Sequence, residues 1–336
     1  MTVIYAILIF LVLIFVHEFG HFITAKACGV KVNEFALGMG PAICKKQKGE
    51  TLYALRIFPI GGYCAMEGED EDSEHPRAFN NRPAWQRAIV LAAGSLMNLL
   101  TCVVLLIIIA FWAGQPTTTL ENIEPGSPAQ AAGLLPGDTI VQVDDVKVRS
   151  WDDVIQSIGQ AESETIQITV VRDGEEIGIT SDLEYNKEQK RNMIGISPAS
   201  ERHVGSSFAA GIKNTGKMAV MMYDTLRQLF TGDVSVKELS GPVGIIYAVN
   251  VSAQSGIMYV VYLAALLSLN LAIINMLPLP ALDGGRLLFL VIRKITGKRV
   301  TDEMEGKIHF IGITLLFMLM IYVTFNDVLR FIVPKF

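Results

Sequence analysis

Charge is the scarcest property of this chain. Only 18% of its 336 residues are charged, whereas soluble domains contain about 25% charged residues. Two stretches, 88–113 and 256–282, have no charged residue at all. Each is longer than the roughly 20 apolar residues that cross a bilayer as a helix. The composition therefore excludes an ordinary soluble enzyme and a disordered chain, and it indicates a membrane protein.

Paired cysteines and basic tracts are also missing. The chain has four cysteines and no CxxC pair, which is typical of reduced thiols and excludes a secreted disulfide scaffold. It has 28 basic and 33 acidic residues, a net charge of −5 and no basic tract. We therefore expect no nucleic-acid partner.

Four apolar segments are present instead, at about 2–23, 88–113, 256–282 and 308–325. The first has the length of a signal peptide, but it lacks a basic start. It also leads into the sequence HEFGH rather than into a small-residue cleavage site. We expect a retained span, and thus an α-helical polytopic membrane protein with about four transmembrane helices.

The placement of charge predicts the topology. Residues 24–87 carry nine basic side chains and residues 283–307 carry six, so the positive-inside rule puts both loops in the cytoplasm. Four spans then place both termini and the stretch 114–255 outside. Residues 115–205 contain 16 acidic and 7 basic residues, as expected of a solvated extracytoplasmic domain.

The loops suggest three further features. Residues 50–66 alternate apolar and β-prone residues around a Pro and two Gly, which predicts a short hairpin on or within the edge of the membrane. Residues 115–185 predict a small α+β domain, in which Ser150 caps a helix. Residues 206–240 predict a weakly amphipathic helical stretch. It is either an interfacial helix or a plain connection, and the sequence does not decide between them.

These features divide the chain into four predicted parts. Residues 1–113 hold the first two spans and the hairpin, and residues 115–185 form the inserted domain. Residues 186–255 form an extracytoplasmic helical connection, and residues 256–336 hold the last two spans.

The strongest chemical signal lies in the first apolar segment. In the sequence HEFGH, His17 and His21 are four residues apart and so share one face of a helix, where both imidazoles can bind one metal ion. Glu18 lies beside them and could take a proton from water. Ionisable side chains inside a span cost at least about 2.5–3.5 kcal/mol each, so they usually serve a function.

A catalytic zinc site usually has a third protein ligand. The soluble pattern with a third histidine would need it at position 27, but that residue is Ala27. Glu34 is the next carboxylate, although it lies beyond a Gly in a basic loop. Asp283 is the better candidate, because it ends an uncharged stretch in NMLPLPALDGG, where prolines and glycines break the helix. The alternative is that Asp283 only caps the next helix.

Several motifs together resemble the site-2 proteases, which are intramembrane zinc metalloproteases. They are HEFGH, NMLPLPALDGG, GSLMN (94–98), GMGP (38–41), FPIGGY (58–63) and RPAWQRAIVLAAG (82–94). Their order is most similar to the bacterial regulator-of-sigma-E protease branch, and GSPAQAAGLLPGDTIVQVDD resembles one PDZ domain. Ser95 departs from the pattern, since many members have Pro there.

The resemblance implies one Zn²⁺ per chain, bound by His17, His21 and Asp283, with Glu18 as the catalytic base and acid. It implies substrate-binding roles for Asn270 and Asn275, and Asn98 is a further candidate. The alternative for all three is a structural hydrogen bond between helices. It also implies that the 50–66 hairpin is a membrane re-entrant element. The fold class is then four transmembrane helices plus a membrane-associated β-hairpin, with an inserted α+β PDZ-like domain.

The implied function is hydrolysis within transmembrane segments of single-pass membrane proteins, after their ectodomains have been trimmed. Anti-sigma factors and remnant signal peptides are the expected substrates, in the bacterial plasma membrane, with the active site toward the cytoplasm. A peptide is the expected ligand of the PDZ-like domain. Two alternatives are a membrane-anchored PDZ adaptor and a metal-ion transporter that uses the same ligands.

Overall fold

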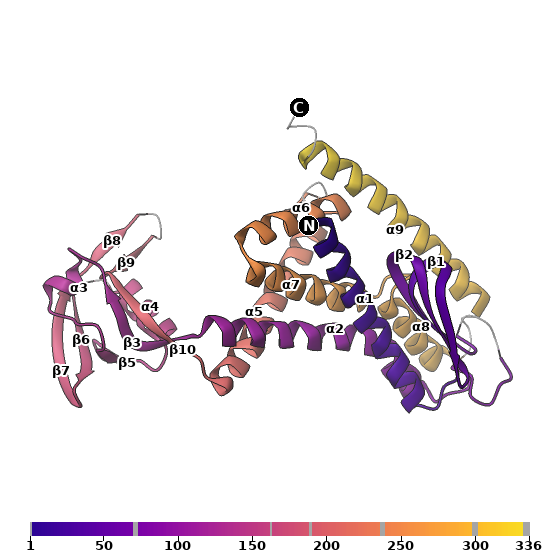
Figure 1. Cartoon of the computed structure of the whole chain (residues 1–336), viewed down its shortest axis with the longest axis horizontal. Helices are drawn as coiled ribbons and strands as arrows, with labels where there is room; N and C mark the ends of the chain where they lie inside the picture. Colours follow the sequence, from indigo (N-terminus) through magenta and orange to yellow (C-terminus); the bar gives the residue numbers. More distant parts are fainter. Residues whose placement is uncertain are drawn as a thin grey trace. The chain divides into compact units, whose positions relative to one another are not determined.

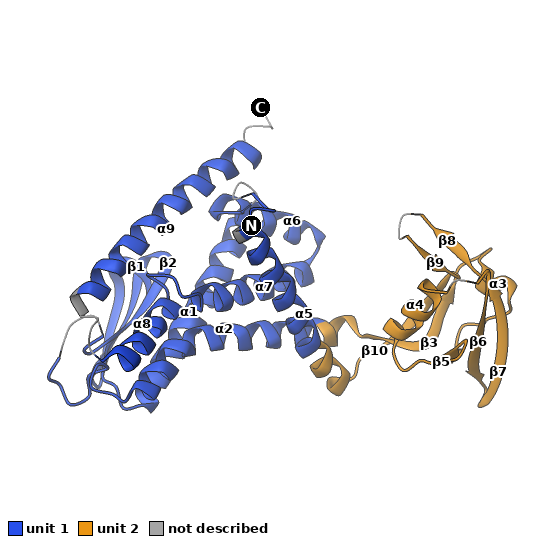
Figure 2. Cartoon of the chain, turned by 180° about the vertical axis from the view of Figure 1, so that it is seen from behind, with its two compact units in different colours: residues 1–109, 211–336 blue, residues 110–210 orange. Residues whose placement is uncertain are grey.

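The structure is a computed structural model that describes residues 2–69, 73–161, 163–187, 190–235, 239–297 and 302–331. These residues form two compact units, one of 1–109 with 211–336 and one of 110–210 (Figure 2). Parts of two predicted features lie outside the described residues: Lys298 and Arg299 of the second basic loop, and 236–238 of the helical stretch.

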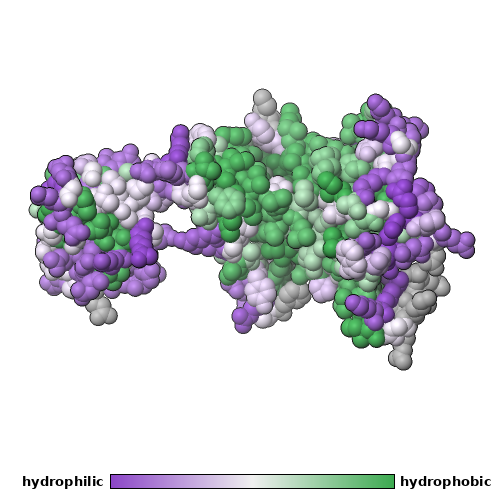
Figure 3. Space-filling view, turned by 90° about the horizontal axis from the view of Figure 1, so that it is seen from below, coloured by the Kyte–Doolittle hydropathy of each residue, from purple (hydrophilic) through white to green (hydrophobic). Residues whose placement is uncertain are grey.

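Among the described residues, four helices are long and apolar enough to cross a membrane. They are α1 (Thr2–Ala27), α2 (Ala84–Ala113), α7 (Ile257–Asn275) and α9 (Asp302–Phe331) (Figure 1). In the apolar 18-residue part of each helix, only 11% to 28% of the residues are buried within the protein, so most of these side chains face outward. Figure 3 shows an apolar surface over the unit of residues 1–109 and 211–336, which we call the helical unit. The four predicted spans are confirmed as candidate membrane helices.

The third span is shorter than its uncharged stretch. Helix α7 ends at Asn275, and a loop of residues 276–282 leads into α8 (Asp283–Thr296). Pro278 and Pro280 lack the backbone N–H groups that would continue the helix, as the sequence predicts. Asp283 thus lies in the first turn of a new helix.

The β element of the helical unit is larger than expected. Strand β1 (Val32–Lys48) pairs antiparallel with β2 (Thr51–Met66). Phe35 pairs with both Tyr53 and Cys64, so the two halves of β2 flank the first half of β1. The predicted pairing within 50–66 was therefore wrong, although β structure there is confirmed. The sequence of β1 is rich in Gly and Lys, and it gave no alternation that would predict a strand.

Two ion pairs hold the loop at the end of α1. The Glu50 carboxylate, in the turn between β1 and β2, accepts hydrogen bonds from Arg77 at 2.7 and 2.8 Å and from Lys26 at 2.5 Å. These bonds lower the pKa of Glu50 to about 2. The Arg77 guanidinium also donates to the carbonyl of Gly29, just beyond α1. The C-terminal end of α1 is therefore fixed to the sheet.

The inserted unit contains a mixed α+β domain. Its main sheet has the strand order β10-β3-β4-β6-β7, with β5 paired to β4, and β8 pairs separately with β9. The elements are β3 (Gln115–Ile123), α3 (Pro128–Ala131), β4 (Thr139–Val143), β5 (Val146–Lys147), α4 (Trp151–Gly159), β6 (Thr165–Arg172), β7 (Glu175–Asp182), β8 (Glu184–Asn186), β9 (Arg191–Met193) and β10 (Ile196–Glu201). Because β10 pairs with β3, the domain extends beyond the predicted end at residue 185.

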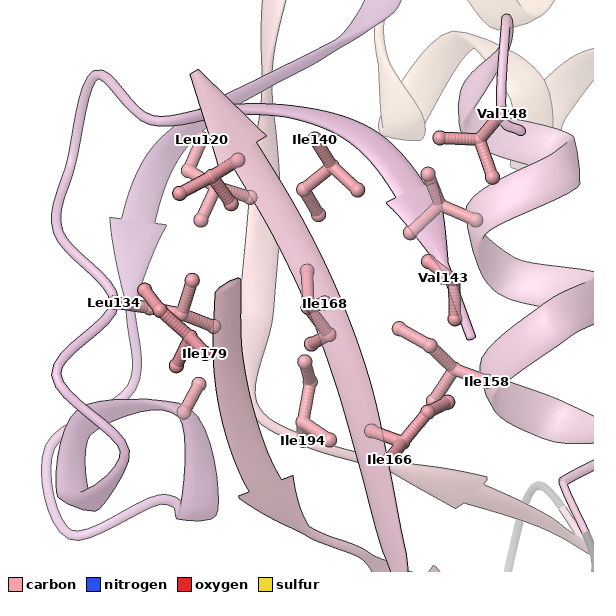
Figure 4. Packing of buried hydrophobic residues seen from close by; sticks show 13 residues of the cluster. Leu120, Leu134, Ile140, Val143, Val148, Ile158, Ile166, Ile168, Ile179 and Ile194 are labelled. Carbon is pink, nitrogen blue, oxygen red and sulfur yellow. The ribbon is translucent and has the colours of Figure 1, made fainter. Parts of the chain in front are cut away.

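Alternating side chains build the core of this domain. Ile166, Ile168 and Val170 on β6 are buried while their neighbours are more exposed. Figure 4 shows Ile166 and Ile168 in the same core as residues of β4 and α4. Ser150 caps α4 in a capping box with Asp153, which confirms the predicted cap.

Two helices follow the inserted domain, α5 (Val204–Thr231) and α6 (Pro242–Ser255). Helix α6 begins at a buried carboxylate from the other end of the chain. Asp327 on α9 is 2% exposed and accepts hydrogen bonds from the N–H groups of Gly241 at 2.9 Å and Gly244 at 2.7 Å. These N–H groups have no partner within the first turn of a helix, so the carboxylate satisfies them and offsets the positive end of the helix dipole.

Candidate active site

Three side chains from two distant segments meet within the helical unit. His17 and His21 lie one turn apart on α1, and Asp283 opens α8. The Nε2 atoms of His17 and His21 are 3.2 Å apart. Asp283 Oδ2 lies 3.3 Å from Nε2 of His17 and 3.4 Å from Nε2 of His21. The side chains are 12%, 9% and 20% exposed, respectively. The structure thus brings together the three residues that the sequence predicted as ligands.

The size of this triangle fits a zinc ion. Ligand atoms at about 2.0–2.1 Å from a tetrahedral zinc lie about 3.3–3.4 Å from one another. The observed edges are 3.2, 3.3 and 3.4 Å. Asp283 Oδ2 is buried and accepts no hydrogen bond in the described structure. Three acceptor atoms that converge in this way repel one another unless a cation lies between them, so the residues present fit the metal.

The outer nitrogens of both rings have polar partners. His21 Nδ1 lies 2.8 Å from the carbonyl oxygen of Val90, so it carries the proton and leaves Nε2 free to bind metal. His17 Nδ1 lies 3.3 Å from the amide of Asn98, which is fully buried. In the described structure Asn98 Oδ1 is buried and has no hydrogen-bond partner. If the amide is turned so that Oδ1 faces the ring, it accepts the Nδ1 proton of His17, and both imidazoles take the same tautomer.

Two glycines allow α1 and α2 to approach closely at this point. A Cβ on Gly94 would lie 2.4 Å from His21 Nε2 and 2.6 Å from His17 Cε1. A Cβ on Gly20 would lie 2.5 Å from the carbonyl oxygen of Ala93. Small residues commonly permit such crossings between membrane helices. Gly94 therefore keeps open the space beside the ligand atoms, a role that the sequence analysis missed.

Glu18 lies on the sheet side of the histidine pair. Its Cγ would be 3.2 Å from a Cβ on Gly62 of β2, so the strand passes close beside the carboxyl group. Tyr63 and Cys64 follow Gly62 in a segment that pairs with the first half of β1. The sequence placed Glu18 next to the histidines, and the structure adds a β-strand along its other side.

The carboxylate of Glu34, the competing candidate ligand, is used elsewhere. It accepts a hydrogen bond of 2.6 Å from Arg56, which also donates to Tyr63. This pairing lies within the β1–β2 sheet and not in the histidine cluster. Leu282 is the N-cap residue of α8, and the first residue of that helix is Asp283. Its position beside the histidines favours the ligand role over the capping alternative.

The three predicted asparagines have different environments. Asn275 Nδ2 lies 3.4 Å from His17 Nε2, so this side chain reaches the cluster from the end of α7. Asn270 is five residues earlier on α7, about 140° around a helix from Asn275, so the two do not share a face. Asn98 is fully buried behind His17. The structure therefore places Asn275 beside the ligand nitrogen of His17 and Asn98 beside the other ring nitrogen of His17.

Comparisons with known proteins identify the family of the chain. The model of peptidase family M50 matches residues 5–319. The chain belongs to this family of zinc metalloproteases, the site-2 proteases. A protein of Clostridium acetobutylicum is 39% identical over 329 residues, 97% of each chain. The regulator of sigma-W protease RasP of Bacillus subtilis is 32% identical over 416 residues, 98% of each chain. That alignment is longer than this chain, so RasP has sequence that this chain lacks.

A zinc metalloprotease of Shouchella clausii, also named RasP, is 33% identical over 412 residues, 97% of this chain and 98% of its own. Among solved structures, the PDZ domain of an SdrC-like protein from Listeria monocytogenes is 20% identical and covers 25% of this chain and 88% of that chain, with a TM-score of 0.23. Family membership and the four candidate spans make the chain a multi-pass membrane metalloprotease of the M50 type. This excludes the adaptor and transporter alternatives as its main function.

Proposed function

We propose that the chain binds one zinc ion through His17, His21 and Asp283 and hydrolyses peptide bonds within transmembrane segments of other membrane proteins. The observation that carries this proposal is the triangle of acceptor atoms with edges of 3.2–3.4 Å, next to Glu18 on a membrane helix. Family M50 membership supports the reaction class.

The chemistry divides between the metal and this chain's own residues. Zinc, when bound, supplies a Lewis acid that polarises a carbonyl and makes water more acidic. Glu18 takes the proton of the attacking water and later gives it to the amine nitrogen that leaves. Val90 and Asn98 hold the two imidazoles with Nε2 toward the metal. In this proposal Asn98 orients a ligand and does not contact substrate, which changes the role expected from the sequence.

A substrate helix must unwind before cleavage, because its carbonyl groups are held in hydrogen bonds to residues four positions on. The segment 62–66 of β2 pairs with β1 on one side and passes Glu18. Its other edge could receive an extended substrate strand by β-addition. Asn275 at the end of α7 can donate to and accept from that strand. Asn270 remains a weaker candidate for the same task.

The topology follows from charge. With both basic loops in the cytoplasm, the termini and the inserted domain lie outside, and the zinc cluster lies toward the cytoplasmic side. We propose single-pass membrane proteins with trimmed ectodomains as substrates, such as anti-sigma factors or remnant signal peptides. The name of the Bacillus subtilis relative, regulator of sigma-W protease, supports the first class. The PDZ-like domain would bind a peptide or exclude untrimmed ectodomains.

The test uses Glu18→Gln in the purified full-length protein. We expect zinc analysis to give one ion per chain and cleavage of a transmembrane peptide to fall at least about 100-fold, since a general base typically contributes 10²–10⁴-fold. Glu34→Gln is the matched control, because that carboxylate pairs with Arg56, and it should keep both zinc and activity. Asp283→Asn should lose zinc. The proposal is wrong if Glu34→Gln loses zinc while Asp283→Asn retains it.

A further inference from the structure

The loop that delivers Asp283 has a strained backbone. Ala281, two residues before Asp283, has φ of 77°. Residues with a Cβ seldom adopt this left-handed region, because it brings Cβ close to the backbone. Such conformations persist only where neighbouring groups hold them, and they cluster at functional sites.

A histidine on α9 holds this residue. The Ala281 N–H donates a hydrogen bond of 2.8 Å to His309 Nδ1. The imidazole is 13% exposed, and its Nε2 lies 3.6 Å from a carboxylate oxygen of Glu305, one turn earlier. Glu305 in turn accepts a hydrogen bond of 2.6 Å from Arg293 of α8. Because Nδ1 accepts, the ring proton lies on Nε2 and faces Glu305.

Close backbone contacts fix the loop from two sides. A Cβ on Gly312, one turn after His309, would lie 2.4 Å from Cβ of Pro280. A Cβ on Gly285 of α8 would lie 2.1 Å from the carbonyl oxygen of Leu279. The loop is thus packed between the start of α8 and the face of α9 that bears His309. Neither side leaves room for the loop to relax without moving a helix.

From this juxtaposition we propose that His309 is a positioning residue, which holds Ala281 in its left-handed conformation and thereby sets Asp283 at the metal site. The inference rests on the proposed role of Asp283 as zinc ligand. A rotation at residue 281 would move everything after it, whereas Asp283 Oδ2 must stay 3.3–3.4 Å from both Nε2 atoms. Without the His309 acceptor, the half-buried Ala281 N–H loses its partner and the strain is no longer offset.

The test compares His309→Asn with His309→Gln in the full-length protein. Asn can place Oδ1 where Nδ1 accepts, whereas Gln places its oxygen nearer to the position of Nε2. We expect the Gln variant to bind Zn²⁺ about 10-fold more weakly, the lower end of the effect of losing a group that orients a metal ligand. The Asn variant should stay near the parent value. Cobalt substitution should show an altered visible spectrum for Gln alone.

A second change tests the strain itself. Glycine adopts positive φ readily, so Ala281→Gly should restore most of the zinc affinity to the His309→Gln variant. Phe310→Leu is the control, because the neighbouring side chain is 71% exposed, and it should change nothing.

Equal zinc affinities and equal cobalt spectra for the Asn and Gln variants would overturn the positioning role, provided that Asp283→Asn loses zinc. Failure of Ala281→Gly to restore affinity would overturn the strain argument. If Asp283→Asn keeps full affinity, the ligand assignment itself fails, and this outcome is distinct from the first.

Discussion

Gly94→Ala gives a sharp test of the helix crossing at the site, because it removes no ligand and adds a single methyl group. The new Cβ would lie 2.4 Å from His21 Nε2 and 2.8 Å from His17 Nδ1. Ordinary contacts between such atoms are about 3.5–4.0 Å. The histidine side chains or α2 must therefore shift by about 1 Å to accommodate the methyl group.

A shift of this size is large for a metal site. Zinc–nitrogen bonds are about 2.0–2.1 Å long, and a 1 Å misplacement at a reacting centre can cost about 100-fold in rate. We expect kcat/KM to fall by about 100-fold or more and zinc affinity to fall with it. The free energy of unfolding should change by less than about 2 kcal/mol. Overpacking costs about 1–3 kcal/mol, but Ala is favoured over Gly in a helix by about 1 kcal/mol.

The assay measures zinc content, zinc affinity and peptide cleavage in detergent, together with thermal unfolding. Gly216→Ala is the matched control. Gly216 lies in α5, and its added Cβ would meet nothing within 4 Å, so zinc content, zinc affinity and cleavage should match the parent, while the free energy of unfolding should rise by about 1 kcal/mol from the helix preference of Ala over Gly. If Gly94→Ala binds zinc and cleaves peptide like the parent, the close approach of α2 to the histidines is refuted.

Two further predictions concern stability. Asp327→Asn removes the negative charge of the carboxylate that accepts hydrogen bonds from two N–H groups at the start of α6. We expect it to lower the free energy of unfolding by about 1–3 kcal/mol. Phe325→Leu is the control, because this side chain is exposed, and it should leave the free energy of unfolding unchanged. The pKa of Glu50 is lowered from its ordinary value of 4.5 to about 2 in the folded protein. Its ion pairs therefore stabilise the fold fully at pH values above 4.5, and this stabilisation is lost as the pH falls from 4.5 toward 2. Thermal melts in this range should therefore depend less on pH for Glu50→Gln than for the parent, and equal slopes would contradict the role of the Arg77 pair.

The sequence predicted those parts of the site that depend on local spacing or composition. Two histidines four residues apart need only a helix to share a face, and the prolines before Asp283 end α7 by their own chemistry. The uncharged stretches likewise predict spans without knowledge of any partner. These features are encoded within a few residues, so one sequence is sufficient to find them.

The features that the sequence did not predict depend on contacts between distant segments. Asn98 has no neighbour in sequence that indicates its partner, so its burial behind His17 was not foreseen. The same holds for His309, whose partner Ala281 lies 28 residues earlier. Strand β1 has no apolar alternation that would indicate its two partner segments in β2, and strand β10 pairs with β3, which lies at the other end of the inserted domain's sequence. Such pairings are set by tertiary packing more than by local preference.

The positions of the proposed ligands along the chain also bear on when the enzyme can become active. His17 and Asn275, which meet at the cluster, are 258 residues apart, and the inserted domain lies between them. At about 5–20 residues per second, synthesis of that interval takes roughly tens of seconds. Until α8 enters the unit, a nascent chain has two of the three ligands and no carboxylate to complete the triangle. We therefore expect the proposed metal site to be complete only after α8 has been synthesised, so that a nascent chain without α8 is inactive.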